Sequence, residues 1–310
     1  MSQSNGLTLL IGGAGQVGRE LQATLSSLGT VLVVERPQLD LTQPDKIRQF
    51  MREVQPRLTV NATAYTAVDK AESDTEVAMA VNAIAPGIFA EESQQLGSTL
   101  VHLSTDYVFD GTQSHPYIET DATHPLGVYG QSKLVGEQAI QAACDDYVIL
   151  RTAWVYGIYG KGNFVKTMLR LGEEREEIRV VADQIGSPTW ARHLAQTVAQ
   201  LAHRGLPGQT QPDPAQPNSS PPPIEAGIYH YTNSGVASWY DFAVAIFEEA
   251  RSHGFAVKVK RIIPITTAEY PTTARRPAYS VLSCAKIAAV LGTQPPHWRE
   301  GLRQMLQGLK

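Results

Sequence analysis

The feature that most constrains the fold is a series of glycines that directly follows an apolar segment near the N-terminus. Residues 7–11 form a continuous apolar run, which is typical of a parallel strand buried on both faces. Gly12, Gly15 and Gly18 follow, and an amphipathic stretch continues to about Leu28. Glycines let a pyrophosphate approach the backbone, and a helix N-terminus offers it free N–H groups. This order of strand, turn and helix therefore predicts a dinucleotide site.

A second strand is predicted at residues 31–34, and it ends at Glu35 and Arg36. Glu35 lies twenty residues after Gly15, where a dinucleotide-binding fold places the residue that contacts the ribose. A carboxylate favours a free 2′-hydroxyl, whereas Arg36 could accept a 2′-phosphate. The sequence leaves the choice between NADH and NADPH open.

Further strands are predicted at residues 58–61, 99–103 and 147–151, and helical patterns alternate with them. Thr42 as the N-cap and Pro44 in the first turn indicate the start of one helix. The helical pattern between the third and fourth strands is broken by Pro86. Alternation of this kind predicts an α/β fold with a Rossmann-type doubly wound parallel sheet.

We expect two domains. Residues 1–156 form the dinucleotide-binding domain, to which segments near 190–204 and 227–232 return, and residues 157–310 form mainly a smaller substrate-binding domain. Residues 207–223 are rich in Pro, Gln, Ser and Asn, a composition that predicts an exposed low-complexity insertion.

Tyr129 and Lys133 are four residues apart in a helical stretch that runs to about Ala143, so they share one helix face. A neighbouring ammonium stabilises a phenolate and should lower its pKa from roughly 10. The pair is a candidate proton donor with a group that tunes it. The alternative is a Tyr129 that packs at the helix start beside a solvated Lys133.

Polar residues follow two predicted strands at the sheet edge where doubly wound folds bind ligands. Thr105 and Asp106 follow the fourth strand, and a loop of small residues, 62–69, follows the third. Thr105 could hydrogen-bond the substrate oxygen that Tyr129 protonates. The alternatives are a capping or turn role for Thr105 and Asp106 and a plain connection for the loop.

Composition narrows the partners and the compartment. With a net charge of −4 and no basic stripe, nucleic acid is not expected to bind. Cys144 and Cys284 form no paired motif, so we interpret them as structural thiols in a reducing compartment. No charged segment precedes the short first apolar run, so we expect a cytoplasmic protein without a membrane span. The eight histidines show no ligand spacing, and no catalytic metal is expected.

The motifs, taken in order, resemble those of the extended short-chain dehydrogenase/reductases, and most closely those of the dTDP-4-dehydrorhamnose reductase family. The resemblance covers nearly the whole chain. It rests on the glycine series, Ala64-Tyr65-Thr66, residues 104–111, Tyr129-x-x-x-Lys133, and residues 151–157, 163–165, 183–189 and 276–280.

By this resemblance, Tyr129 would be the proton donor, Lys133 would lower its pKa and hold the nicotinamide ribose, and Thr105 would bind the substrate carbonyl. Asp106 and Trp154 would contact a nucleotide-sugar, with Trp154 as a core aromatic being the alternative. Arg276 would contact its phosphate, unless it forms a solvated pair with Arg275. The cofactor would be lined by Gly15, Gln16, Val17, Asp40, Leu41, Ala64, Tyr65 and Thr66.

The implied reaction is reduction of the C4 ketone of dTDP-4-dehydro-6-deoxy-L-mannose by NADPH or NADH. The resemblance also allows a homodimer, since some family members bridge two copies through a metal held by acidic residues. A 4,6-dehydratase would need a second carboxylate after Asp106, where this chain has Tyr107. The same motifs are also compatible with another nucleotide-sugar reductase, an epimerase with tightly held NAD, or a non-catalytic subunit of the methionine adenosyltransferase regulatory type.

Overall fold

The computed structural model describes residues 6–206 and 224–310. The predicted insertion at 207–223 lies outside the described residues. Six strands form one sheet in the order β10-β5-β4-β3-β1-β2, and every neighbouring pair is parallel. The predicted Rossmann-type fold class is thereby confirmed. The strands are β1 (Thr8–Ile11), β2 (Val31–Val34), β3 (Leu58–Asn61), β4 (Thr99–Thr105), β5 (Tyr147–Thr152) and β10 (Gly227–His230).

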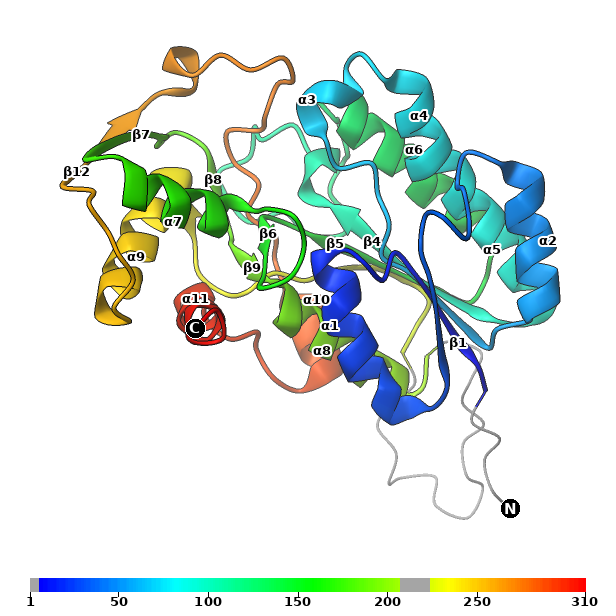
Figure 1. The fold of residues 1–310 in the computed structure, drawn as a ribbon. Helices are drawn as coiled ribbons and strands as arrows, with labels where there is room; N and C mark the ends of the chain where they lie inside the picture. Colours follow the sequence, from blue (N-terminus) through cyan, green and yellow to red (C-terminus); the bar gives the residue numbers. More distant parts are fainter. Residues whose placement is uncertain (1–5, 207–223) are drawn as a thin grey trace.

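Helices cover both faces of this sheet (Figure 1). Leu10 of β1 packs in the core with α1 (Gln16–Leu25) and α8 (Ala191–Arg204), whereas its neighbours Leu9 and Ile11 pack in the core on the opposite face. Burial on both sides explains why Leu9, Leu10 and Ile11 are apolar in succession rather than at alternate positions. The helices of the opposite face are α2 (Pro44–Val54), α5 (Ala85–Leu96) and α6 (Val128–Ala143).

Two local predictions were wrong in detail. The residue that precedes α2 is Gln43, and Thr42 instead donates to the Asp40 carboxylate. Pro86 does not break the helical region from 75 to 96, because α4 (Thr75–Met79) continues through a π-helical turn (Ala80–Ile84) into α5 and Pro86 occupies the first turn of α5. Proline has no N–H to donate, and here it directly follows the π-helical turn, in which the Ala85 N–H bonds the Ala80 carbonyl.

A smaller region is built around α7 (Phe164–Glu174), α9 (Trp239–Ser252) and α11 (Trp298–Gln307). Ser238 caps α9 reciprocally with Asp241, as the Ser signal predicts. In this region β7 (Glu177–Val181) pairs with β12 (Arg261–Ile265). Its separate apolar core includes Val165, Phe242, Phe247, Trp298 and Leu302.

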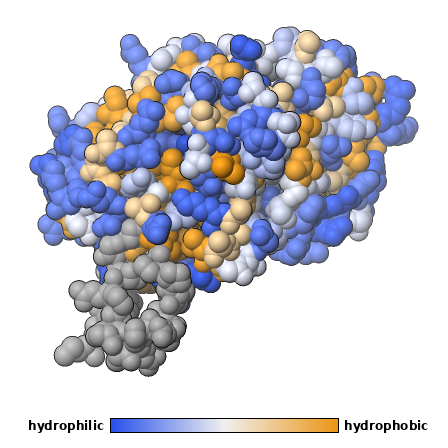
Figure 2. Space-filling model, turned by 180° about the vertical axis from the view of Figure 1, so that it is seen from behind, coloured by the Kyte–Doolittle hydropathy of each residue, from blue (hydrophilic) through white to orange (hydrophobic). Residues whose placement is uncertain are grey.

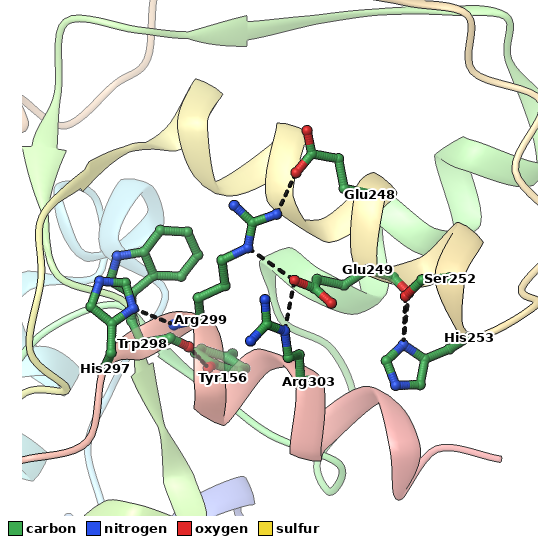
Figure 3. A network of polar contacts seen from close by, with 9 residues as sticks. All are labelled: Tyr156, Glu248, Glu249, Ser252, His253, His297, Trp298, Arg299 and Arg303. Carbon is green, nitrogen blue, oxygen red and sulfur yellow. Dashed lines mark hydrogen bonds and ion pairs between the residues drawn. The ribbon is translucent and has the colours of Figure 1, made fainter.

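An ion-pair network fixes the last helix to this region (Figure 3). The carboxylate of Glu249, on α9, accepts hydrogen bonds at 2.9 Å from both Arg299 and Arg303 of α11. Arg299 also pairs with Glu248. Glu249 is largely buried, and two guanidinium groups compensate its charge, as a buried carboxylate requires.

Hydrophobic and hydrophilic residues are interspersed on the face seen from behind (Figure 2). Within residues 6–206 and 224–310, no helix is both long and apolar enough to span a membrane.

Candidate active site

The glycine turn after β1 has the shape needed to hold a pyrophosphate. Gly12 has a φ of +90°, and a Cβ added at Gly18 would lie 2.0 Å from the Gly12 carbonyl oxygen. Only glycine can occupy these positions without moving the backbone. Gly15 precedes α1 without a side-chain cap, and its own Cβ position meets no atom closer than 3.5 Å. The first N–H groups of α1 are therefore available to an anion.

Gln16 ties this turn to the smaller region. Its Nε2 donates to the Val155 carbonyl at 3.0 Å, and its Oε1 accepts from Asn163 at 3.3 Å. Asn163 also caps α7. The side chain of Gln16 thus contacts protein, while the neighbouring Val17 packs against the sheet core.

The residues predicted to contact the adenosine end follow β2. Arg36 is exposed and Glu35 is half-buried. The Asp40 carboxylate accepts bonds from the backbone and hydroxyl of Thr42 and from Gln43, and these bonds lower the pKa of Asp40 to about 2. Asp40 is therefore a charged residue at neutral pH, and Leu41 beside it is buried.

The loop 64–66 is held by Asn82, a residue of the π-helical turn that the sequence reasoning missed. Asn82 Oδ1 accepts from the Tyr65 backbone N–H at 2.8 Å, and its Nδ2 donates to the Tyr65 carbonyl at 3.2 Å and to the Ser132 hydroxyl at 3.0 Å. Ser132 belongs to α6, so Asn82 couples the loop to the helix that carries Tyr129 and Lys133. A polar residue within an otherwise apolar helical pattern was the one available signal.

Thr105 and Tyr129 meet at the carboxyl end of β4. Burial raises the pKa of the Tyr129 phenol to about 12, against an opposing effect of the nearby Thr105 hydroxyl. The ring of Tyr129 stands edge-on to Tyr107, with centroids 5.5 Å apart. Two polar groups that could contact one oxygen are thereby placed side by side.

The expected lowering of the Tyr129 pKa by Lys133 was wrong for this arrangement. Lys133 is only 1% exposed, and its Nζ bonds the Leu103 carbonyl at 2.6 Å and His102 Nε2 at 2.9 Å. Burial lowers the pKa of Lys133 to about 8, against an opposing effect of Glu137. Lys133 Nζ is thus directed toward β4, and burial of the phenol has the larger effect on the pKa of Tyr129.

Asp106 presents an unpaired carboxylate oxygen. Asp106 is 2% exposed, and its Oδ1 accepts from the Thr105 hydroxyl at 3.1 Å. Its Oδ2 has no hydrogen-bond partner among the residues that the structure describes. Burial raises the pKa of Asp106 to about 6, although the Ser280 and Thr105 hydroxyls act in the opposite direction. Such an oxygen can accept a bond from a ligand hydroxyl.

Trp154 and Arg276 extend the site into the smaller region. Trp154 is half-buried, has a φ of 48°, and stacks on Trp239 with ring centroids 3.6 Å apart. A positive φ is uncommon in a residue of this size and is frequent at functional sites. Arg276 forms a two-point ion pair with Asp69, whereas Arg275 is exposed. The two arginines are therefore not equivalent.

Comparison with known proteins agrees with this geometry. The family model described as the RmlD substrate binding domain matches residues 7–310. The chain is 44% identical to the dTDP-4-dehydrorhamnose reductase of Burkholderia thailandensis, over 94% of this chain and 95% of that protein. It is 42% identical to that of Escherichia coli K12, over 97% of both.

Solved structures give the same result. The crystal structure of dTDP-4-dehydrorhamnose reductase from Bacillus anthracis in complex with NADP has a TM-score of 0.85 and 37% identity, and the match covers 98% of this chain and 99% of that one. A UDP-glucose 4-epimerase from Thermotoga maritima, at 17% identity and a TM-score of 0.76, shares the fold. The chain therefore belongs to the dTDP-4-dehydrorhamnose reductase family.

Proposed function

We propose that this protein reduces the C4 ketone of dTDP-4-dehydro-6-deoxy-L-mannose to give dTDP-L-rhamnose, with NADPH or NADH as reductant. The observation that carries the proposal is the position of the Thr105 hydroxyl, at the end of β4, near the Tyr129 phenol in the first turn of α6, with Lys133 one helical turn away. The glycine turn, with its uncapped α1, fits a dinucleotide pyrophosphate. Relatives more than 40% identical carry the name of this activity.

Tyr129 would donate the proton to the alkoxide that forms at C4. Burial keeps its pKa near 12, so the phenol holds its proton at neutral pH and can release it as negative charge develops on the oxygen. Thr105 would donate a hydrogen bond to the same oxygen and orient the ketone. When bound, the nicotinamide supplies the hydride.

Each end of the dinucleotide would have its own contacts. The turn residues Gly12, Gly15 and Gly18 would bind the pyrophosphate through backbone N–H groups. The ribose of the nicotinamide would bind to Lys133. The remaining cofactor contacts would come from Gln16, Val17, Glu35, Arg36, Asp40, Leu41, Ala64, Tyr65 and Thr66.

The nucleotide-sugar would lie toward the smaller region. Asp106 Oδ2 would accept a sugar hydroxyl, Trp154 would pack against the ligand, and Arg276 would contact the diphosphate. This arrangement supports a division in which residues 1–156, with segments near 190–204 and 227–232, bind the dinucleotide and the rest of 157–310 binds mainly substrate.

The experiment is to follow nicotinamide absorbance with purified protein, dTDP-4-keto-6-deoxy sugars and either NADPH or NADH, and to identify the product by NMR. Oxidation of one reduced cofactor for each product formed would distinguish a reductase from an epimerase with tightly held NAD. No oxidation with any such sugar, together with stoichiometric capture of a methionine adenosyltransferase, would replace the proposal with a regulatory role. Light scattering would test the homodimer.

A further inference from the structure

Behind the proposed site lies a buried chain of polar groups, of which the proposed function uses only Lys133. It runs from Thr63 through Asn61 and His102 to Lys133. Asn61 and His102 are 0% exposed and Lys133 is 1% exposed. Asn61 Nδ2 lies 3.1 Å from His102 Nδ1, and His102 Nε2 lies 2.9 Å from Lys133 Nζ.

The direction of this chain is set at its Thr63 end. The backbone N–H of Thr63 can only donate, and it lies 3.0 Å from Asn61 Oδ1. The Thr63 hydroxyl donates to the same oxygen. The oxygen of the Asn61 amide therefore faces Thr63, and its NH₂ group faces His102 Nδ1, which must accept.

A neutral imidazole that accepts at Nδ1 carries its proton at Nε2 and donates there. Burial lowers the pKa of the His102 ring well below its usual value, so the ring is neutral. Lys133 Nζ must then accept a hydrogen bond from His102 Nε2–H. Accepting needs a lone pair, which the uncharged amine has and the ammonium lacks. The other close partner of Nζ, the Leu103 carbonyl at 2.6 Å, can also accept from the uncharged amine, which keeps two N–H groups.

We propose that the Asn61–His102 pair favours the uncharged form of Lys133, and thereby couples dinucleotide binding to the uptake of a proton from solvent at pH values where Lys133 of the free protein is uncharged. This inference rests on the proposed function, because it assigns Lys133 to the ribose of a nicotinamide dinucleotide. His102 is a positioning residue: it acts through Lys133. Ribose hydroxyls offer acceptors that an ammonium satisfies and that a neutral amine satisfies less well.

The other charged groups near Lys133 do not reverse this preference. Glu137, one turn further along α6, raises the pKa of Lys133. Its carboxylate is already neutralised by Arg151 of β5, which donates to it at 2.6–3.1 Å, and it also accepts from the Ser104 hydroxyl. The desolvation of Lys133 acts in the same direction as the hydrogen-bond chain.

Two measurements without any sugar test the proposal. Ring-nitrogen chemical shifts of His102, assigned by their loss in His102→Gln, should show Nδ1 unprotonated and Nε2 protonated. The dissociation constant of NADPH, from about pH 6.5 to about pH 9.5, should rise by about tenfold per pH unit once Lys133 has lost its proton in the free protein.

Asn61→Asp should reverse the direction of the hydrogen bonds at His102, because a carboxylate at position 61 accepts from Thr63 and also from His102 Nδ1. His102 Nε2 then becomes an acceptor for the ammonium, so binding of NADPH should be nearly independent of pH over the same range. The matched control is His193→Gln. His193 Nδ1 contacts Asn233 Nδ2 at 2.7 Å in the same way, and this variant should keep the wild-type pH dependence.

A His102 protonated at Nδ1, or the same pH dependence of binding in Asn61→Asp as in the wild type, would overturn the proposal. If Asn61→Asp does not fold, the proposal is tested by the ring-nitrogen chemical shifts of His102 in the wild type and by the pH dependence of NADPH binding in His102→Gln. In His102→Gln an amide oxygen can face Nζ, so a weaker pH dependence is expected. Since no sugar is present, failure to reduce any keto sugar would contradict the proposed function and leave these results unaffected.

Discussion

Arg276 and Asp69, 207 positions apart, join the smaller region to the large sheet through two hydrogen bonds of 2.7 and 3.2 Å. Asp69 lies just beyond the loop that follows β3, in α3 (Val68–Ala71). The pKa of Asp69 is lowered, first of all by its bond to Arg276. The pair therefore places a guanidinium group beside the loop that carries Ala64, Tyr65 and Thr66.

Arg276→Ala should raise the KM for the nucleotide-sugar by about 10- to 100-fold, because a charge-assisted bond to a phosphate contributes roughly 1.5–3 kcal/mol. The dissociation constant of NADPH should not change. Arg275→Ala is the matched control, since that side chain is exposed, and steady-state kinetics should give wild-type values. Equal effects of the two substitutions would show that Arg276 has no specific contact with the substrate.

Tyr129→Phe should reduce kcat by about 10²- to 10⁴-fold, the usual contribution of general acid catalysis. The ring remains, so NADPH should bind with unchanged affinity in a fluorescence titration. Tyr159→Phe, at an exposed tyrosine, is the control and should leave kcat unchanged. Turnover of Tyr129→Phe at the wild-type rate would refute the assignment of the proton donor.

Thr105→Val removes the hydroxyl near the Tyr129 phenol but keeps the branched shape. It should reduce kcat by about 10²-fold or more, as the loss of one oxyanion donor does. Thr105→Ser keeps the hydroxyl and should retain most of the activity. A Val variant as active as the Ser variant would rule out a role for this hydroxyl in binding the ketone oxygen.

Asp106→Asn should stabilise the protein above neutral pH while weakening substrate binding. Burial raises the pKa of Asp106 from 3.8 to about 6, so the folded state favours the protonated acid. This contribution is fully present below about pH 4, and it is lost as the pH rises through about 6. By linkage, the charged carboxylate then costs on the order of 2–3 kcal/mol, which the amide avoids.

Urea unfolding of the wild type and of Asp106→Asn at about pH 8 and about pH 4 would measure the difference in the free energy of unfolding. The gain in stability should be large at the higher pH and should disappear at the lower one. A gain that is the same at both pH values would show that charge on Asp106 is not its cause.

Features with a local cause could be predicted from the sequence. The fold class followed from apolar strands that alternate with helical patterns, since burial on both faces of a parallel sheet favours runs of apolar residues such as 9–11. The glycine turn could be predicted because Gly12 needs a positive φ and Gly18 a missing side chain. The spacing of Tyr129 and Lys133 placed them on one helix face, which depends on helix geometry alone.

Partners distant in the sequence were decided by the tertiary structure alone. Nothing around His102 signals that its ring lies between Asn61 and Lys133, and nothing around Asp69 signals Arg276, because these contacts depend on how the strands and the two regions are placed in space. The same holds for charge. Four-residue spacing predicted a lowered pKa for Tyr129, whereas desolvation, which depends on the whole surrounding fold, raises it.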